Sequence, residues 1–509
     1  MNFDVLQCNY QHNPVIRGDS AVLTWNYRAG CDRDVRQVSF GVAIAEDPDF
    51  TFPVWASPEI LSDAMRCELP AEVTLKPSTC YFWRVSSRDS SGQTSLSPTQ
   101  SFETALAGPE VWKNLHAKWI TCGPDKSVEP ASPVFCLDIS LPGTVTWARA
   151  YVFGLGWQQL TINGRPCASW LLAPPNSHYD RVCLYETYPI TDFLVRGNNR
   201  IELALGNGYN ANYSQWGWRW FGPKGVKAIF LIRCGSRTIC RVTDGSWRYR
   251  TGPIQACDIY NGEVYSAIYP ERQDAPAYVD PQPDVAPQGV MQPNEMPHIT
   301  VYKEVEPVSC WRSGKDMIYD FGTNSAGFVR IKVRAPRGHK LTFQFSELIA
   351  KNGTLSPITN RLAQAQDRYI CSGSGEEEYQ PLFTYHGFRY VQVSGYTEDV
   401  SSLTLTACLI SADVETTGSF ACSDPVINRI HQQALNSMRS NFMSIPTDCP
   451  SRDERTPCQM DSQSTEEAAI FNYNMNAYYR KWLDDIAGET GNPDWNGDQI
   501  HLAWRLYRN

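Results

Sequence analysis

Residues 423–442, SDPVINRIHQQALNSMRSNF, mark the point at which the chain changes from β-type to helical sequence. Ser423 and Asp424 are both N-cap candidates, because their side-chain oxygens can accept a hydrogen bond from a free backbone N–H at a helix start. Pro425 follows at the first helical position, where its missing N–H costs nothing. The apolar residues beyond it recur at helical spacing. The stretch therefore predicts a helical C-terminal part behind a β-rich N-terminal part.

Two more helices are predicted downstream. One is expected to begin at Ser464, with Glu467 completing a capping box, and to continue through Ile470 and Tyr473 to Trp482. QIHLAWRLYRN, residues 499–509, predicts the start of another.

Upstream, short alternating strands separated by turns dominate the sequence. The first segment resembles a fibronectin type III module, a small antiparallel sandwich, with Trp25, Phe40, Tyr81 and Trp83 as core aromatics. The next has many short strands and Asn-Gly turns, which suggest a jelly-roll sandwich. The predicted order is residues 1–106, a fibronectin III-like or immunoglobulin-like sandwich; 107–273, a jelly-roll domain; 274–297, a proline-rich extended linker; 298–412, a second β-sandwich; and 413–509, the helical part.

Trp216, Trp218 and Trp220 alternate within NYSQWGWRWFG and would share one face of a strand. Such a row is a candidate platform for the apolar face of a sugar ring. Packing against a neighbouring domain explains it equally well.

Charge and composition narrow the classes of function. The chain has 45 basic and 54 acidic residues, a net charge of -9, and no basic stripe, which argues against nucleic acid as a partner. The N-terminus lacks a basic segment followed by an apolar one, and nowhere do eighteen apolar residues run together. We expect a cytoplasmic protein without a membrane partner.

Cysteine and histidine give no sign of a metal or a disulfide framework. The seventeen cysteines are odd in number and scattered, with no C-x-x-C, so reduced thiols are expected. The eight histidines are dispersed and form no H-E-x-x-H. We therefore predict no metal and no cofactor.

Residues 445–463, IPTDCPSRDERTPCQMDSQ, hold four carboxylates and two arginines between the first two predicted helices. Pro446 and Pro450 prevent continuous helix, which predicts a loop. For a charge run alone, a solvated salt-bridge loop is the default interpretation. Loops held by rigid elements are also where chemistry is commonly found.

Cleavage of a glycosidic bond requires a carboxylic acid that protonates the leaving oxygen, and further carboxylates and an arginine suit sugar hydroxyls. Glu454 is flanked by Asp453 and close in sequence to Asp448. Neighbouring carboxylates disfavour ionisation, so we expect a raised pKa for Glu454 and the role of general acid.

The segment IPTDCPSRDER and the DSQ that follows it closely resemble the signature of the bacterial α-L-rhamnosidases, glycoside hydrolase family 78. GLGWQQLTINGR, LAPPNSHYD, DFGTNSAGFVRI and FTYHGFRYVQV, in this order, resemble the β domains of that family. GSFACSDPVINRI resembles the entry into its catalytic barrel. The resemblance covers most of the chain from about residue 117 onward.

The resemblance implies inverting hydrolysis of terminal α-L-rhamnosyl residues, without a metal, by an (α/α)6 barrel that follows β domains. Glu454 matches the general acid. Matching positions that line the rhamnose subsite are Asp448, Arg452, Asp453 and Asp461, and GNPDWNGDQIH adds Trp495 and Asp498.

The chain also departs from the family pattern. TPCQMD stands where the family has Gly-Trp-x-Gly-Asp, so an aromatic platform is lost although Asp461 is kept. About three helices are predicted where such a barrel needs about twelve, so the barrel is expected to be incomplete and C-terminally truncated. No residue matches the catalytic base, and Glu466 and Asp485 are interpreted as helix-start or surface residues.

Two classes of function remain open at this point. One is an α-L-rhamnosidase acting on rhamnose-containing glycosides or polysaccharides, with the activity of this chain alone undecided. The alternative is a non-catalytic carbohydrate-binding or scaffold protein derived from a rhamnosidase. A homo-oligomer or a complementing barrel fragment is a further expected partner, because Trp482 and Trp504 would otherwise present apolar surface.

Overall fold

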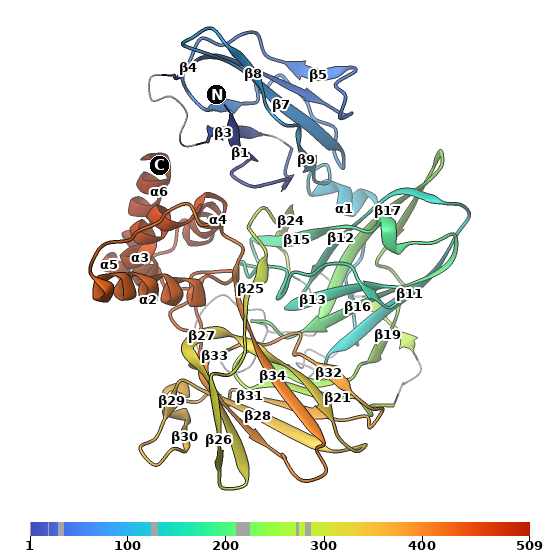
Figure 1. The fold of residues 1–509 in the computed structure, drawn as a ribbon. Helices are drawn as coiled ribbons and strands as arrows, with labels where there is room; N and C mark the ends of the chain where they lie inside the picture. Colours follow the sequence, from blue (N-terminus) through green and yellow to red (C-terminus); the bar gives the residue numbers. More distant parts are fainter. Residues whose placement is uncertain are drawn as a thin grey trace. The chain divides into compact units, whose positions relative to one another are not determined.

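The computed structural model describes residues 2–18, 20–28, 35–123, 131–209, 224–270, 274–279 and 287–508. The chain forms two compact units, of which unit 1 contains residues 1–114, 291–297 and 476–481, and unit 2 contains the remainder. In Figure 1 the blue and green parts of the chain are mainly strands, with the short helix α1 in the light-blue part, and helices α2 to α6 belong to the orange to red C-terminal part.

The N-terminal part of unit 1 is a sandwich of two sheets, as the alternating sequence predicts, and its strands pair antiparallel except where Val15–Ile16 runs parallel to Gln100–Thr104. Trp25, Phe40, Tyr81 and Trp83 are all buried in its core, which confirms their predicted place. The first sheet has the strand order β1 (Phe3–Cys8), β3 (Val22–Tyr27), β6 (Arg66–Glu68). The second has the order β2 (Val15–Ile16), β9 (Gln100–Thr104), β7 (Cys80–Asp89), β4 (Gln37–Ala45), β5 (Pro53–Ala56), and β8 (Thr94–Leu96) also pairs with β7. The short helix α1 (Glu110–Asn114) follows in the sequence.

Unit 2 begins with two more antiparallel sheets that share one hydrophobic core. The core consists of inward-facing aliphatic and aromatic side chains of both sheets, as period-two strands require. The first sheet has the strand order β23 (Tyr278–Val279), β10 (Ile120–Thr121), β17 (Gly225–Cys234), β12 (Val145–Gly154), β15 (Val182–Pro189), and β18 (Arg237–Val242) also pairs with β17. The second has the order β14 (Arg165–Pro166), β13 (Trp157–Ile162), β16 (Gly197–Gly206), β11 (Pro133–Leu141), β19 (Arg248–Thr251), β22 (Ala275–Pro276). The 3-10 turn η1 (Thr191–Phe193) lies between β15 and β16 in the sequence.

The proline-rich stretch 274–297 differs from the extended linker that its composition predicts. Its described residues include β22 and β23, which pair with strands of the preceding domain, and β24 (Val290–Pro293). Proline is tolerated in such edge strands because it lacks only the N–H that a sheet ladder would use.

A ten-stranded sheet forms the third β part, with its own core. Its first two strands precede residue 273, so the predicted boundary there separates strands that the structure pairs together: β21 runs parallel to β31. The strand order is β20 (Ile254–Asp258), β21 (Gly262–Ser266), β31 (Gln366–Ile370), β28 (Lys340–Ser346), β33 (His386–Ser394), β27 (Asp316–Arg334), β34 (Ser402–Ala412), β25 (Ile299–Val305). Strands β26 (Ser309–Ser313) and β32 (Glu377–Tyr379) also pair with β27. A separate pair, β29 (Leu348–Ile349) and β30 (Leu355–Ser356), is followed in the sequence by the 3-10 turn η2 (Pro357–Asn360).

Helix α2 (Pro425–Asn441) begins where the sequence predicts. The side chain of Asp424, not Ser423, is the N-cap and accepts a hydrogen bond of 2.8 Å from the backbone N–H of Val426. Pro425 occupies the first helical position. Both features were readable from the local sequence.

The second predicted helix is wrong in its bounds. Helix α3 (Gln459–Asn472) begins before Ser464 and ends at Tyr473, whose backbone is extended, and α4 (Asn476–Ile486) follows as a separate helix. Glu467 therefore lies inside a helix and completes no capping box. The helical part ends with α5 (Pro493–Asn496) and α6 (Asp498–Arg508).

Two further observations concern the described residues. None of their helices combines the length and the apolar character that a bilayer crossing needs. None of the sixteen described cysteines forms a disulfide.

Candidate active site

The acid-rich loop lies between α2 and α3 in unit 2 and is closed upon itself. Backbone bridges join Phe442 to Pro446 and Thr447 to Pro457. The start of strand β33 packs directly against the loop: a Cβ added at Gly387 would lie 2.8 Å from a side-chain carbon of Pro450. A glycine is therefore required at this position for the strand and the loop to approach one another.

Arg455 anchors the loop to the β part of unit 2. Its side chain is completely buried, and its guanidinium donates to the backbone carbonyl oxygens of Ile259 and of Tyr385, the latter at 2.6 Å. It also donates to the carbonyl oxygens of Ser451 at 3.2 Å and Arg452 at 3.1 Å. Arg455 therefore satisfies backbone groups rather than neutralising a carboxylate, as it would in the solvated salt-bridge loop that is the default interpretation of the charge run.

Aromatic rings enclose the same guanidinium. The carbon atom at its centre lies 5.6 Å from the ring of Tyr260 and 5.2 Å from that of Tyr385. Tyr260 also donates its hydroxyl hydrogen to the backbone oxygen of Glu454 at 2.8 Å. These contacts fix the backbone that carries the candidate acid.

Two arginines and the Asp448 carboxyl group converge on Glu454 in this loop. Arg452 contacts both Asp448 and Glu454 through Nη2, each at 3.3 Å. Arg361 reaches the same cluster from the β part, with Nη1 2.9 Å from Glu454 and Nε 3.3 Å from Asp453. The side chain of Glu454 remains 26% exposed, so a ligand can reach it.

The pKa values of the two central carboxyl groups, Asp448 and Glu454, are shifted in opposite directions. Burial raises the pKa of Asp448 and prevails over the hydrogen bond that it accepts from the Thr456 N–H. Burial also raises the pKa of Glu454, but the hydrogen bond with Asp448 and the charges of Arg361 and Arg452 outweigh it, and the net pKa is lowered. The expectation of a raised Glu454 pKa is therefore wrong for the free site, because the sequence did not reveal the second arginine.

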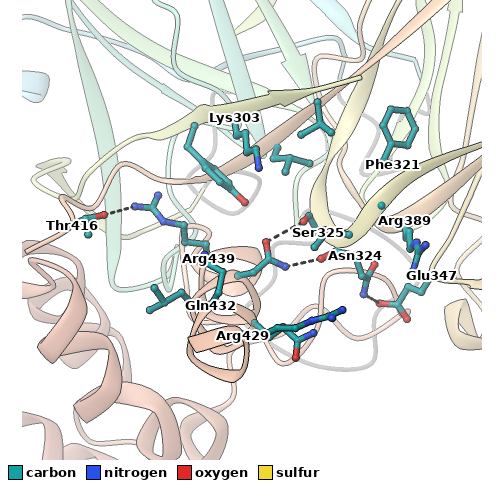
Figure 2. A pocket seen from close by; sticks show the side chains of 18 of the residues that line it. Lys303, Phe321, Asn324, Ser325, Glu347, Arg389, Thr416, Arg429, Gln432 and Arg439 are labelled. Carbon is teal, nitrogen blue, oxygen red and sulfur yellow. Dashed lines mark hydrogen bonds between the residues drawn. The ribbon is translucent and has the colours of Figure 1, made fainter. Parts of the chain in front are cut away.

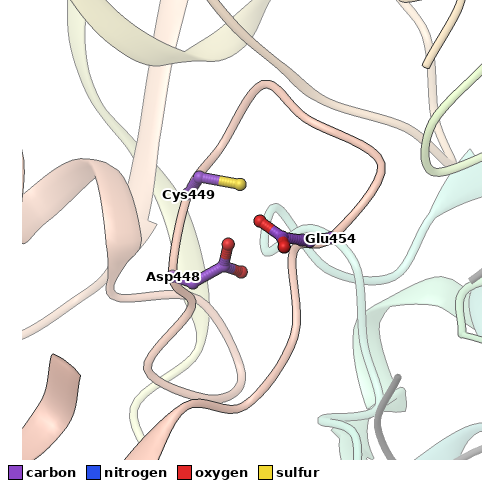
Figure 3. A group of neighbouring side chains, drawn as sticks. All are labelled: Asp448, Cys449 and Glu454. Atoms are coloured by element: carbon purple, nitrogen blue, oxygen red, sulfur yellow. The ribbon is translucent and has the colours of Figure 1, made fainter. Parts of the chain in front are cut away.

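Figure 3 shows the side chains of Asp448, Cys449 and Glu454 turned toward one another, with ligand-type atoms within 4.8 Å. A cation is a poor fit to this group. Burial raises the pKa of the Cys449 thiol, which disfavours the thiolate that binds metals, and Arg452 already contacts both carboxylates. The arrangement is an ion-paired network that can hold one proton between two carboxyl groups.

Among the described residues, Asp461, Trp495 and Asp498 form no hydrogen bond or ion pair with Asp448, Arg452 or Glu454. Asp461 is exposed in the first turn of α3, where its carboxylate contacts Cys458. Trp495 is 43% exposed on α5. The row of Trp216, Trp218 and Trp220 lies outside the described residues.

Asp498 is fully buried and pairs with a second carboxyl group. One of its oxygens accepts the indole N–H of Trp482 at 3.1 Å, and the carboxyl of Glu466 is hydrogen-bonded to it. Arg505 contacts Glu466. Glu466 and Asp485 are buried and thus not surface residues, contrary to their interpretation from the sequence, while Trp482 is covered and Trp504 is 58% exposed.

Arg361 is the residue that sequence reasoning missed. It belongs to the segment after η2, in a different predicted domain, and no motif marks it. Its backbone has a φ of +55°, uncommon for a residue with a side chain, and Arg455 has a φ of +50°. Strained backbone of this kind is often retained at functional sites.

Comparison with known proteins places these features in a family. The family models described as Rha78A-like N-terminal immunoglobulin domain, α-L-rhamnosidase N-terminal domain, bacterial α-L-rhamnosidase concanavalin-like domain, and bacterial α-L-rhamnosidase six-hairpin glycosidase domain match residues 3–108, 143–309, 312–411 and 415–504. The fold and loop thus define a multidomain protein with an N-terminal immunoglobulin-like domain and a six-hairpin glycosidase domain.

Individual relatives agree with this class. An α-L-rhamnosidase of Formosa agariphila is 28% identical, over 96% of this chain and 56% of that protein. The solved α-L-rhamnosidase of Dictyoglomus thermophilum is 30% identical with a TM-score of 0.89, covering 99% of this chain and 62% of that one. That of Streptomyces avermitilis, solved with L-rhamnose, shares the fold with a TM-score of 0.87 at 20% identity, over 99% of this chain and 68% of that one.

The chain belongs to the bacterial α-L-rhamnosidase family, glycoside hydrolase family 78. It spans about half the length of the curated relatives it matches.

Proposed function

We propose that this chain carries the acid side of an α-L-rhamnosidase site, which cleaves terminal α-L-rhamnosyl residues from glycosides with inversion. The observation that carries the proposal is the convergence of Asp448, Arg452 and Glu454 in one loop that matches the family signature. The family match favours this hydrolase over a protein that only binds carbohydrate.

In this proposal Glu454 protonates the oxygen of the departing group. Asp448, Arg452 and Asp453 bind the hydroxyls of the sugar, for which carboxylates and a guanidinium are suitable partners. The exposed Asp461 and Trp495 remain candidates for the same subsite. Asp498 has weaker support, because its side chain is buried and already bonded to Trp482.

Asp448 does not suit the role of the base that activates water. Its carboxylate lies within 4.8 Å of that of Glu454. Inverting glycosidases separate the two carboxyl groups by roughly 6.5–9.5 Å so that a water molecule fits between them and the sugar. The proposal therefore assigns Asp448 to positioning and proton storage, and assigns no base among residues 413–508.

The free site holds Glu454 ionised, whereas a general acid must be protonated. Arg361 is the contact most easily changed, because its side chain is 47% exposed. We infer that a glycoside enters between Arg361 and Glu454, and that loss of this contact raises the pKa of the acid. Asp448, whose pKa is raised, is then the neighbouring source of the proton.

We also propose finer fold assignments. The two-sheet sandwich of residues 1–106 is fibronectin III-like, and the two paired sheets that contain β10 to β19 with β22 and β23 form a jelly roll. Residues 298–412, together with β20 and β21, form a further sandwich-type domain. Helices α2 to α6, within residues 413–509, are the opening part of an (α/α)6 barrel, which the six-hairpin family model supports.

The test measures the binding of methyl α-L-rhamnoside to the chain by isothermal titration calorimetry. We expect saturable binding that Asp448→Asn weakens about tenfold, since hydrogen bonds to charged groups are worth roughly 1.5–3 kcal/mol. Glu467→Gln, a change on the exposed side of α3, serves as the matched control. Equal binding of methyl α-L-fucoside, or binding unchanged in Asp448→Asn, would contradict the proposal.

A further inference from the structure

A cavity lined by charged, amide and aromatic side chains lies in unit 2, and none of its lining residues belongs to the acid loop. Its volume is about 930 Å³. Helix α2 forms one wall, and strands β25, β27 and β33 with the start of β29 form the others. Figure 2 shows Arg429, Gln432 and Arg439 on the helix side, with Lys303 on the strand side. The volume lies at the upper end of the range that small-molecule sites occupy.

The charges that line this cavity are mainly positive. Lys303, Arg429 and Arg439 have no carboxylate partner within the part of the chain that the structure describes. The fourth cation, Arg389, is neutralised by two hydrogen bonds of 2.8 Å to Asp320.

One carboxylate, Glu347, opposes these three cations in the lining. Its oxygen accepts a hydrogen bond from the side-chain amide of Asn324 at 2.9 Å. An excess of cations in a hollow with low-dielectric walls attracts anions, because field lines are focused there.

Arg439 is held in place before any ligand arrives. Its Nη2 donates to the hydroxyl oxygen of Thr416 at 3.0 Å. The guanidinium also lies over two rings, 5.1 Å from the centre of Tyr302 and 4.8 Å from that of Tyr473. A guanidinium fixed in this way loses little conformational entropy on binding, and its planar fork matches a carboxylate.

The polar groups between the cations are also ordered. The amide of Asn436 donates to the backbone oxygen of Asn324 at 2.7 Å, and its oxygen accepts from the hydroxyl of Ser325 at 3.2 Å. Gln432 and Gln433 are exposed in the lining and offer amide donors and acceptors. Such amides suit a ligand with many hydroxyl groups.

From this lining we propose that the cavity is a binding site for a saccharide that carries a carboxylate, of the size of a disaccharide. The carboxylate binds Arg429, with Lys303 and Arg439 adding positive charge elsewhere in the lining, and the hydroxyls bind the amides of α2. Phe321 and Tyr302 supply apolar surface for a sugar ring. This site is independent of the acid loop and does not require the proposed rhamnosidase activity.

The experiment compares two disaccharides that differ only at one carbon. Cellobiouronate carries a carboxylate where cellobiose carries a hydroxymethyl group. Isothermal titration of the whole chain is expected to give saturable one-to-one binding of cellobiouronate, at least about tenfold tighter than cellobiose, and weaker at higher salt. Equal affinity for both sugars, or no binding of either, would overturn the proposal.

Variants locate the binding. Arg429→Gln is expected to weaken cellobiouronate about tenfold, and Lys303→Gln several-fold. Arg368→Gln is the matched control, because within the described residues the Arg368 side chain bonds to Gln366 alone and lies outside the cavity. Unchanged affinity in Arg429→Gln would place the sugar elsewhere. A competition experiment with inorganic phosphate tests the saccharide assignment. If phosphate at equal concentration displaces cellobiouronate, the cavity binds anions in general and the assignment is overturned.

Discussion

At the scale of single residues, two arginines divide the work around Glu454. Arg455 is buried and bonded to backbone carbonyl oxygens, so it holds the loop in place. Arg361 is half exposed and bonded to carboxylates, so it affects the pKa of Glu454 rather than the conformation of the loop. The two substitutions are therefore expected to separate stability from titration.

Replacement of Arg361 by glutamine is expected to raise the pKa of Glu454. The substitution removes a positive charge 2.9 Å from the carboxylate, and that charge lowers the pKa in the wild type. Titration of the side-chain carboxyl carbons by ¹³C NMR, with Glu454→Gln used to assign the signal, measures the change. Arg361→Lys should restore part of the lowering.

Arg368→Gln is the matched control for this titration, since it removes an exposed arginine whose side chain bonds to Gln366 and to no carboxylate in the part of the chain that the structure describes. An unchanged Glu454 midpoint in Arg361→Gln would contradict the assigned role of Arg361.

Replacement of Arg455 by methionine is expected to destabilise the loop and its β neighbours strongly. The change leaves several buried carbonyl oxygens without a donor, each costing about 1–3 kcal/mol. Differential scanning calorimetry should show a clear loss of thermal stability. Arg452→Met is the control, because that side chain is 40% exposed, and it should affect ligand binding more than stability. A melting profile like that of the wild type would disprove the anchoring role.

At the scale of elements, local signals were reliable where local chemistry decides the structure. Asp424 and Pro425 determine the start of α2, and alternating aromatics determine the core of the first sandwich. The break between α3 and α4 was missed, because Tyr473 continues the apolar spacing of a helix although its backbone is extended. Tertiary contacts overrode the periodicity there: Tyr473 forms a bridge with Thr416.

The pair of Glu466 and Asp498 links α3 to α6 and gives this helical part a pH dependence. Burial, then the Asp498 carboxylate, raise the pKa of Glu466 to about 8. In the unfolded chain it would titrate near 4.5, so between these values the folded state binds more protons. The free energy of unfolding contributed by this group therefore falls as pH rises from about 4.5 to about 8.

Urea unfolding followed by the helical circular dichroism signal at pH 5 and pH 8 measures this dependence. Glu466→Gln should reduce the difference between the two pH values, whereas Glu467→Gln, at a side chain 54% exposed, should not. Glu263 in the ten-stranded sheet has a pKa raised to about 8 by burial and contributes in the same direction, so each variant is compared with the wild type. An identical pH difference in Glu466→Gln would contradict the expectation.

At the scale of the whole molecule, the sequence identified the family and the acid loop but not the full site. IPTDCPSRDER is a contiguous signature, so its loop could be found by inspection. Arg361 is distant in sequence and approaches Glu454 only because the segment after η2 packs beside the loop. The buried state of Asp498 and Glu466 depends on the packing of α3 against α6, which spacing alone does not reveal.

The central claim is that Glu454 protonates the leaving group of an α-L-rhamnoside. The most direct measurement compares cleavage of phenyl and 2,4-dinitrophenyl α-L-rhamnoside by the wild type and Glu454→Gln, in the presence of azide. Azide attacks the anomeric carbon without a general base, so the acid is tested by itself. We predict that Glu454→Gln loses about 10²–10⁴-fold on the phenyl glycoside, whose leaving group needs the proton, and far less on the dinitrophenyl glycoside. Equal losses on both substrates, or no cleavage of either by the wild type, would contradict the account.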